Sequence, residues 1–132
     1  MKKILIVDDD RTTLHVLQSL LNGAGYSTRV AMDGVEGLKL LGAEPFDLLL
    51  LDVWMPRMDG LAVLAKLRSR RQKPRVIVMT SDDTPETLIR AVREQAFKYV
   101  QKPVESETLL SAVRDALETP DLPPIEVISA RP

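Results

Sequence analysis

Residues 4–10 read Ile-Leu-Ile-Val-Asp-Asp-Asp, which is four apolar residues followed at once by three acids. A continuous apolar run of this length is typical of a strand buried on both faces of a parallel sheet, because a half-exposed strand would alternate with polar residues. Residues 47–52 repeat the pattern, since four leucines lie between Asp47 and Asp52. Both stretches therefore predict central strands that end in carboxylates.

Outward from these two stretches, short apolar strands alternate with amphipathic helices. The predicted strands are residues 4–7, 26–31, 47–51, 75–79 and 98–101. The predicted helices cover residues 11–24 and 106–118 and, between them, begin at Asp33, after Gly60 and at Thr84. Such alternation implies parallel strands joined by right-handed crossovers. Five strands of this size fit an α/β, flavodoxin-like, doubly wound five-stranded parallel sheet in the order 2-1-3-4-5.

The composition indicates one globular domain and excludes several kinds of site. The chain has 132 residues, of which 45% are hydrophobic and 28% are charged, and its formal net charge is −1. This balance points to neither nucleic acid nor an acidic membrane as a partner of this domain. The lack of cysteine and the single histidine exclude disulfides, thiol chemistry, and Cys-type or His-rich metal sites. No apolar stretch approaches the roughly 18 residues that would span a membrane, so we expect a cytoplasmic protein.

The distinctive polar residues all follow the ends of predicted strands. Asp8 and Asp9 come after the first strand, Asp52 after the third, Thr80 after the fourth and Lys102 after the fifth. The carboxyl ends of parallel strands meet at one edge of the sheet, and ligands bind there where the strand order reverses. In the predicted order this point lies between the first and third strands. We therefore expect these side chains to form one site.

This set of side chains suits phosphoryl chemistry with a metal ion. Three clustered carboxylates repel one another unless a cation neutralises them, and a hard ion such as Mg2+ prefers oxygen ligands. A carboxylate can attack phosphorus and form an acyl phosphate. Phosphoryl transfer needs mainly positioning and neutralisation of the oxygens. The ammonium of Lys102 and the hydroxyl of Thr80 would contribute to both.

These motifs resemble a known family. The chain looks like a response-regulator receiver domain of two-component signalling over roughly residues 1–118, with the motifs in the family's order and spacing. The matching segments are residues 4–10, 50–56, 58–60, 78–81 and 99–103. The resemblance implies that Asp52 is the phosphoacceptor. It also implies that Asp9 and Asp52 ligate Mg2+ directly, that Asp8 acts largely through water, and that the backbone carbonyl of Trp54 is a further ligand.

The resemblance also implies how such a domain signals. Lys102 would pair with the phosphoryl group and Thr80 would swing toward it. Tyr99 would then change rotamer and reshape the face made by the fourth helix, fifth strand and fifth helix. The donor would be the phosphohistidine of a sensor histidine kinase or a phosphotransfer protein. The domain would catalyse its own phosphorylation and slow dephosphorylation, so its status as an enzyme is partial, and a homodimer through the switching face is left open.

Two regions depart from a simple reading of the family. Residues 119–132 contain four prolines and read as a Pro-rich linker or the start of a downstream output domain, since residues 125–128 alternate like the start of another strand. The receiver domain would then be residues 1–118. In the turn before the fifth strand the family often has glycine, where this chain has Gln95. A positive φ at Gln95 would strain the backbone.

Three other functions share parts of this pattern. A flavodoxin-type FMN protein has the same strand order but wants a hydroxyl- and Gly-rich phosphate loop where this chain has three acids. An Asp-nucleophile phosphatase typically places a second acid two residues after the nucleophile, and Trp54 occupies that position. A degenerate receiver that acts only as a binding scaffold remains the alternative within the family.

Overall fold

The computed structural model describes residues 1–53, 59–67, 70, 74–81, 84–119 and 126–128, and within them strands and helices alternate along the chain. The strands are β1 (Lys3–Val7), β2 (Ser27–Ala31), β3 (Leu48–Asp52), β4 (Arg75–Thr80), β5 (Lys98–Gln101) and β6 (Glu126–Ile128). The helices are α1 (Arg11–Gly23), α2 (Gly34–Ala43), α3 (Gly60–Leu67), α4 (Pro85–Arg93) and α5 (Ser106–Glu118). All the paired strands are parallel, in the order β2-β1-β3-β4-β5-β6.

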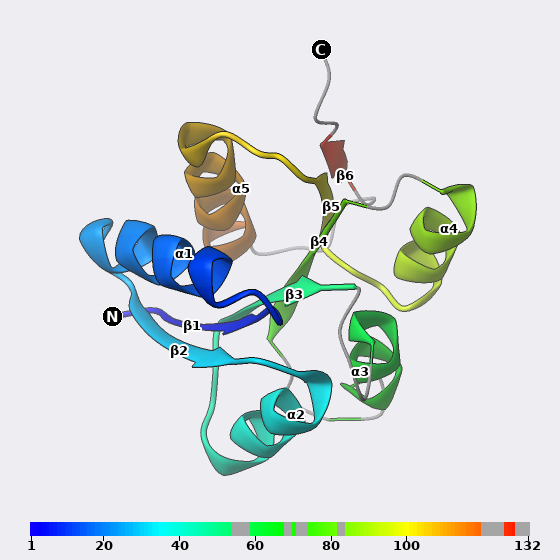
Figure 1. The fold of residues 1–132 in the computed structure, drawn as a ribbon, viewed down its shortest axis with the longest axis horizontal. Helices are drawn as coiled ribbons and strands as arrows, with labels where there is room; N and C mark the ends of the chain where they lie inside the picture. The colour runs from blue at the N-terminus through cyan, green and yellow to red at the C-terminus, as the bar shows by residue number, and fades with distance from the viewer. Residues whose placement is uncertain (54–58, 68–69, 71–73, 82–83, 120–125, 129–132) are drawn as a thin grey trace.

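Helices cover both faces of this sheet, with α1 and α5 on one face and α2, α3 and α4 on the other (Figure 1). Successive residues of β1 point to opposite faces, so Ile4 and Ile6 pack with α1 and α5. Leu5 and Val7 pack with α2 and α3. All four are at most 1% exposed. The continuous apolar run is thus explained by burial on two sides.

Aspartate side chains cap the first turns of two helices. The Asp10 carboxylate accepts a hydrogen bond from the Thr12 amide at the start of α1. Asp33 accepts from the Glu36 amide at 2.8 Å and so begins α2. Thr84 occupies the cap position of α4 without a side-chain cap hydrogen bond. Among the described residues, no helix is both long enough and apolar enough to cross a membrane.

The observed sheet confirms the predicted five-strand order and adds a sixth strand. Residues 126–128, which the sequence suggested as the start of a strand in a further domain, pair in parallel with β5 of this same sheet. The predicted ends of the third and fourth strands were one residue too early, because Asp52 and Thr80 are the last residues of β3 and β4 rather than the first residues after them. The backbone of both residues is therefore held by strand pairing.

The turn between α4 and β5 shows the strained backbone that the sequence raised as a question. Gln95 has a φ of 64°, which lies in the left-handed region. The amide of Gln95 donates to the Val92 carbonyl and the amide of Ala96 donates to the Ala91 carbonyl, so the turn closes the helix tightly. A side chain with a Cβ is disfavoured in this conformation, and glycine would relieve it.

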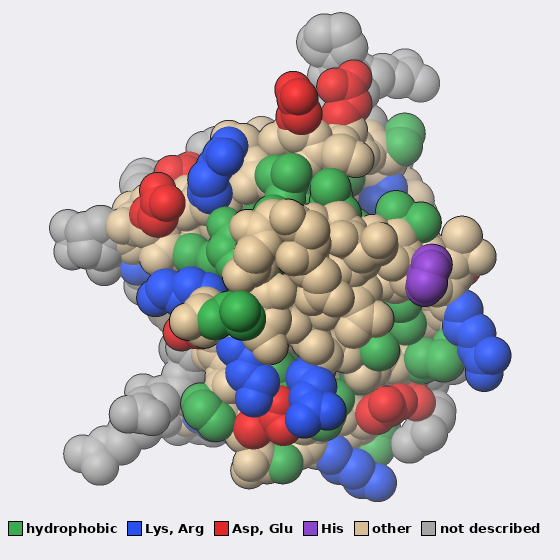
Figure 2. All heavy atoms as spheres, turned by 90° about the vertical axis from the view of Figure 1, so that its left-hand side faces the viewer, with side chains coloured by type: hydrophobic (Ala, Val, Ile, Leu, Met, Phe, Trp, Pro, Cys, Tyr) green, Lys and Arg blue, Asp and Glu red, His purple; other side chains and the backbone are tan. Residues whose placement is uncertain are grey.

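Charges are mixed on the side of the molecule that carries α1 and β2. Figure 2 shows Lys and Arg side chains interspersed with Asp and Glu, and neither sign forms a continuous patch among the coloured side chains of this face. That distribution agrees with the formal net charge of −1.

Candidate functional site

The three predicted acidic residues meet at the carboxyl-terminal edge of the sheet. Strands β1 and β3 are neighbours, with Val7 opposite Leu51, so the residues that follow and end these strands lie side by side. One carboxylate oxygen from each of Asp8, Asp9 and Asp52 lies within 4.8 Å of the others. Asp8 and Asp52 are 1% and 7% exposed, whereas Asp9 is exposed. The cluster thus has a buried base and an open side.

Lys102 brings a positive charge to this cluster. Its Nζ lies 2.8 Å from an oxygen of Asp8 and 3.8 Å from an oxygen of Asp52. Its backbone amide donates to the Thr80 carbonyl at 2.7 Å, which ties the residue after β5 to the end of β4. Among the four charged groups of this cluster, negative charges still outnumber the positive charge by two. A cation at the open side would reduce that imbalance.

Asp10, the third acid of the run, has a different role. Its side chain accepts from the Thr13 hydroxyl at 2.8 Å and from the Thr12 amide, and these hydrogen bonds lower the pKa of the Asp10 carboxyl below its usual value. The Asp10 amide also donates to Asp8 at 3.0 Å. Asp10 therefore caps α1 and helps to orient Asp8.

The donor set fits a hard divalent cation such as Mg2+. All three clustered side chains offer carboxylate oxygens, which Mg2+ prefers. Two ligands on opposite sides of a Mg2+ ion lie about 4.2 Å apart, because each bond is about 2.1 Å. The spread of at most 4.8 Å among the three oxygens is close to that span. The three oxygens therefore lie close enough together to hold one ion, directly or through its water ligands.

The junction between β3 and α3 holds Asp52 in place through a residue that the sequence analysis did not assign to the site. The Gly60 amide donates to the Val53 carbonyl at 2.9 Å. A Cβ built on Gly60 would overlap the backbone carbonyl of Asp52. Only glycine allows this approach. The sequence signal was the Asp59-Gly60 pair, which marks the start of a helix and lies in a family-matching segment but does not by itself indicate a contact with Asp52.

Of the remaining predicted site residues, the structure describes Thr80 and Tyr99 but not Trp54. Thr80 is fully buried at the end of β4, and its strand partner is Gln101. Tyr99 is 1% exposed and belongs to the core layer that faces α3 and α4. The switch role of these two residues stays a prediction. Trp54, whose carbonyl was predicted as a metal ligand, lies outside the described residues.

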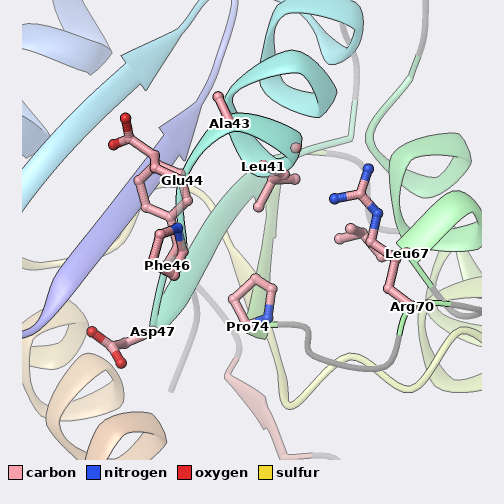
Figure 3. A pocket seen from close by; sticks show the side chains of 10 residues that line it. Leu41, Ala43, Glu44, Phe46, Asp47, Leu67, Arg70 and Pro74 are labelled. Carbon is pink, nitrogen blue, oxygen red and sulfur yellow. The ribbon is translucent and has the colours of Figure 1, made fainter.

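A separate pocket lies at the opposite edge of the sheet (Figure 3). It has a volume of about 500 Å³ and is bounded by the loop before β3 and the end of α3. The Glu44 carboxylate at its rim is bound by Lys3 at 2.6 Å and by Arg29 at 3.2 Å. These bonds lower the pKa of Glu44, chiefly through the hydrogen bond from Lys3. This pocket is remote from the three clustered acids and shares no residue with them.

Comparisons with known proteins give matches over most of the chain. The model of the response regulator receiver domain family matches residues 4–114. Response regulator MprA of Mycobacterium avium (strain 104) is 39% identical over 115 residues, which are 87% of this chain and 50% of that protein. The same regulator of Mycobacterium sp. (strain KMS) is 39% identical over 127 residues, which are 92% of this chain and 55% of that protein. This chain thus spans about half the length of the curated relatives it matches.

Solved structures show the same likeness. A CheY-like response regulator receiver domain protein from Methanospirillum hungatei JF-1 superposes with a TM-score of 0.86 at 32% identity, covering 89% of this chain and 94% of that one. Response regulator TrrA from Thermotoga maritima, solved in complex with Mg2+ and BeF, has a TM-score of 0.81 at 30% identity, covering 89% and 100%. With its fold, its acidic edge and a family match over most of its length, the chain belongs to the response regulator receiver domain family.

Proposed function

We propose that this receiver domain accepts a phosphoryl group on Asp52 in a reaction that requires Mg2+. The observation that carries the proposal is the cluster of Asp8, Asp9 and Asp52 at one sheet edge, with the Lys102 ammonium against it. Family membership supports this role over the FMN and phosphatase alternatives. A Mg2+ and BeF complex of the related TrrA adds support for the metal.

The chemistry follows from the groups at this edge. An oxygen of Asp52 attacks phosphorus, and the phosphorus–nitrogen bond to the donor imidazole breaks with its electron pair left on nitrogen. Asp9 and Asp52 would hold Mg2+ directly, with Asp8 acting largely through water and the Trp54 carbonyl as a further ligand, and the bound ion would neutralise charge on the phosphoryl oxygens. Lys102 leaves Asp8 to pair with the phosphoryl group, and the Thr80 hydroxyl donates to it. Attack by water on phosphorus later restores the carboxylate and releases phosphate.

The output of this reaction is a change of the face formed by α4, β5 and α5. Tyr99 lies on β5 and Thr80 on the neighbouring strand β4, and both residues are buried. Movement of the Thr80 hydroxyl toward the phosphoryl group frees space that Tyr99 can fill. We propose this exchange as the switch, with a homodimer through the same face as one readout.

The wider context of the domain is proposed from its relatives. The donor is the phosphohistidine of a sensor histidine kinase or a phosphotransfer protein. Because curated relatives are about twice as long, we propose that residues 1–118 form the receiver and that residues 119–132 lead toward an output domain. The protein acts in the cytoplasm, and this domain itself binds neither nucleic acid nor membrane.

The test is covalent labelling with a small phosphodonor. The parent, Asp52→Asn and Asp47→Asn proteins are incubated with acetyl phosphate and Mg2+, and intact mass is measured. Asp47 is the matched control, because it lies at the other end of β3 and accepts a hydrogen bond from the Lys3 amide. We expect a mass gain of one phosphoryl group in the parent and in Asp47→Asn, lost in Asp52→Asn and after chelation of Mg2+.

Two results would decide against the proposal. A parent protein that gains no phosphoryl mass from acetyl phosphate or from a phosphorylated histidine kinase would indicate a degenerate receiver that signals by binding alone. A gain that persists in Asp52→Asn would move the acceptor to another residue.

A further inference from the structure

We propose that the outer edge of β5, with the adjoining side of α5, is a docking surface for an extended peptide strand, and that residues 126–128 of this chain are its built-in and releasable occupant. This surface is part of the face formed by α4, β5 and α5, so a strand docked on it covers part of that face. It rests on strand pairing and packing, and it stands whether or not Asp52 is phosphorylated.

The pairing is specific in register but short. Strand β6 has three residues, and each lies opposite one residue of β5 in a parallel ladder: Glu126 opposite Lys98, Val127 opposite Tyr99 and Ile128 opposite Val100. An unpaired strand edge offers a row of N–H and C=O groups that any extended segment can use. The tail takes that position on β5.

One side chain anchors the docked strand. Ile128 is partly buried and packs against the core layer that contains Val100 and the inner face of α5. Val127 points to the other face of the sheet and is 45% exposed. The surface therefore favours a peptide with an apolar side chain at the position of Ile128 and accepts different side chains at the position of Val127.

The space beside the anchor is not filled. A hollow of about 390 Å³ lies between Ile128, Lys98 and the α5 residues Ser111 and Asp115. Lys98 is 2% exposed and its Nζ is held by Asp115 at 2.9 Å, which fixes one wall of the hollow. A peptide strand with a larger side chain beside the anchor position can therefore fill this hollow and contact more of the surface than residues 126–128 do.

The balance of forces makes the tail releasable. Ordering three backbone residues opposes docking, whereas the ladder hydrogen bonds and the partial burial of one isoleucine side chain favour it, so the net free energy of docking is small. Docked and released states are then both populated, and short elements of this kind open more readily than the core. A trans-acting peptide strand must displace the tail, whose tether gives it a high effective concentration.

The first experiment measures docking of the tail in the full chain. Amide hydrogen exchange is followed by NMR in the parent, in Ile128→Asp and in the matched control Val127→Asp. We expect amides of residues 126–128 to exchange at least about tenfold slower than in an unstructured peptide in the parent and in Val127→Asp. In Ile128→Asp this protection is lost while β1 and β3 stay protected. Unprotected amides at 126–128 in the parent, or equal behaviour of the two variants, would overturn the proposal.

The second experiment tests the surface in trans. The synthetic heptapeptide Pro-Ile-Glu-Val-Ile-Ser-Ala, which is residues 124–130, is titrated into labelled Ile128→Asp protein. We expect shifts of the amide signals of residues 98–101, and at least about tenfold more peptide to be needed in the parent because the tether competes. A peptide with Asp in place of the second Ile should give no shifts. Shifts with both peptides, or with neither at millimolar concentration, would show that β5 has no such surface.

Discussion

The two edges of the sheet treat charge in opposite ways. At the amino-terminal edge, Glu44 is bound by both Lys3 and Arg29, and Asp47 accepts from the Lys3 amide. At the carboxyl-terminal edge, three carboxylates gather around a single ammonium. At the amino-terminal edge the carboxylates are paired within the protein, whereas the carboxyl-terminal edge has an excess of negative charge and an open side. The difference teaches that the excess of one charge, rather than the number of charged residues, marks the functional edge.

The largest effect that we expect at the carboxyl-terminal edge comes from a single methyl group. Gly60→Ala places a Cβ on the Asp52 carbonyl, and the strain should lower the free energy of unfolding by about 3 kcal/mol. Gly42→Ala near the amino-terminal edge is the control, because a Cβ there meets nothing within 4 Å. It should raise stability by about 0.5 kcal/mol through helix propensity. Urea denaturation measures both, and equal effects would show that the junction tolerates a side chain.

Removing a charge should stabilise the open edge. Asp9→Asn relieves repulsion among the clustered acids, so the ion-free protein should gain about 1 kcal/mol in unfolding free energy. Added Mg2+ should stabilise the parent by mass action and have little effect on Asp9→Asn. Glu44→Gln serves as the control at the other edge, and Mg2+ should stabilise it as much as the parent. Thermal unfolding with and without Mg2+ checks this, and a loss of stability in ion-free Asp9→Asn would contradict the charge argument.

Backbone strain at the turn before β5 gives a smaller effect. Gln95→Gly should raise the free energy of unfolding by about 0.5 to 1 kcal/mol, since glycine adopts the observed φ of 64° without a Cβ clash. Glu94→Gly, where φ is −87°, should instead be destabilising because glycine adds only entropy to the unfolded chain. Paired urea titrations measure the two variants. A higher free energy of unfolding in both variants would mean that relief of the positive φ at Gln95 is not the cause of the gain.

The smallest effect concerns the closed edge and its dependence on pH. The hydrogen bond from Lys3, helped by Arg29, lowers the pKa of Glu44 in the folded protein below its ordinary value of 4.5. A lowered folded pKa means that this carboxylate contributes stability above the ordinary value and loses it as pH falls through the lowered one. The stability difference between parent and Glu44→Gln should therefore be present at neutral pH and vanish in acid. A difference that grows in acid would reverse the sign of the argument.

Local patterns and topology together predicted most of the fold and the meeting of the acids. The apolar run at residues 4–7 and the leucines at 48–51 predict buried strands, and parallel topology then brings Asp8, Asp9 and Asp52 to one edge. The role of Gly60 was missed because its contact with Asp52 depends on the angle between a strand and the following helix. The partner of residues 126–128 was missed because a three-residue strand carries no local information about which sheet it joins. Trp54 stays a prediction, since it lies outside the described residues.

The hydrogen bond from the Gly60 amide to the Val53 carbonyl has a consequence for how this domain can vary. It joins the two ends of the segment between Asp52 and α3, so the ends stay in register whatever lies between them. The backbone of Asp52, the residue before Val53, is therefore held from both the strand and the following helix. The domain thereby ties the position of its acceptor to one glycine, so that a change at Gly60 puts folding and reactivity at risk together.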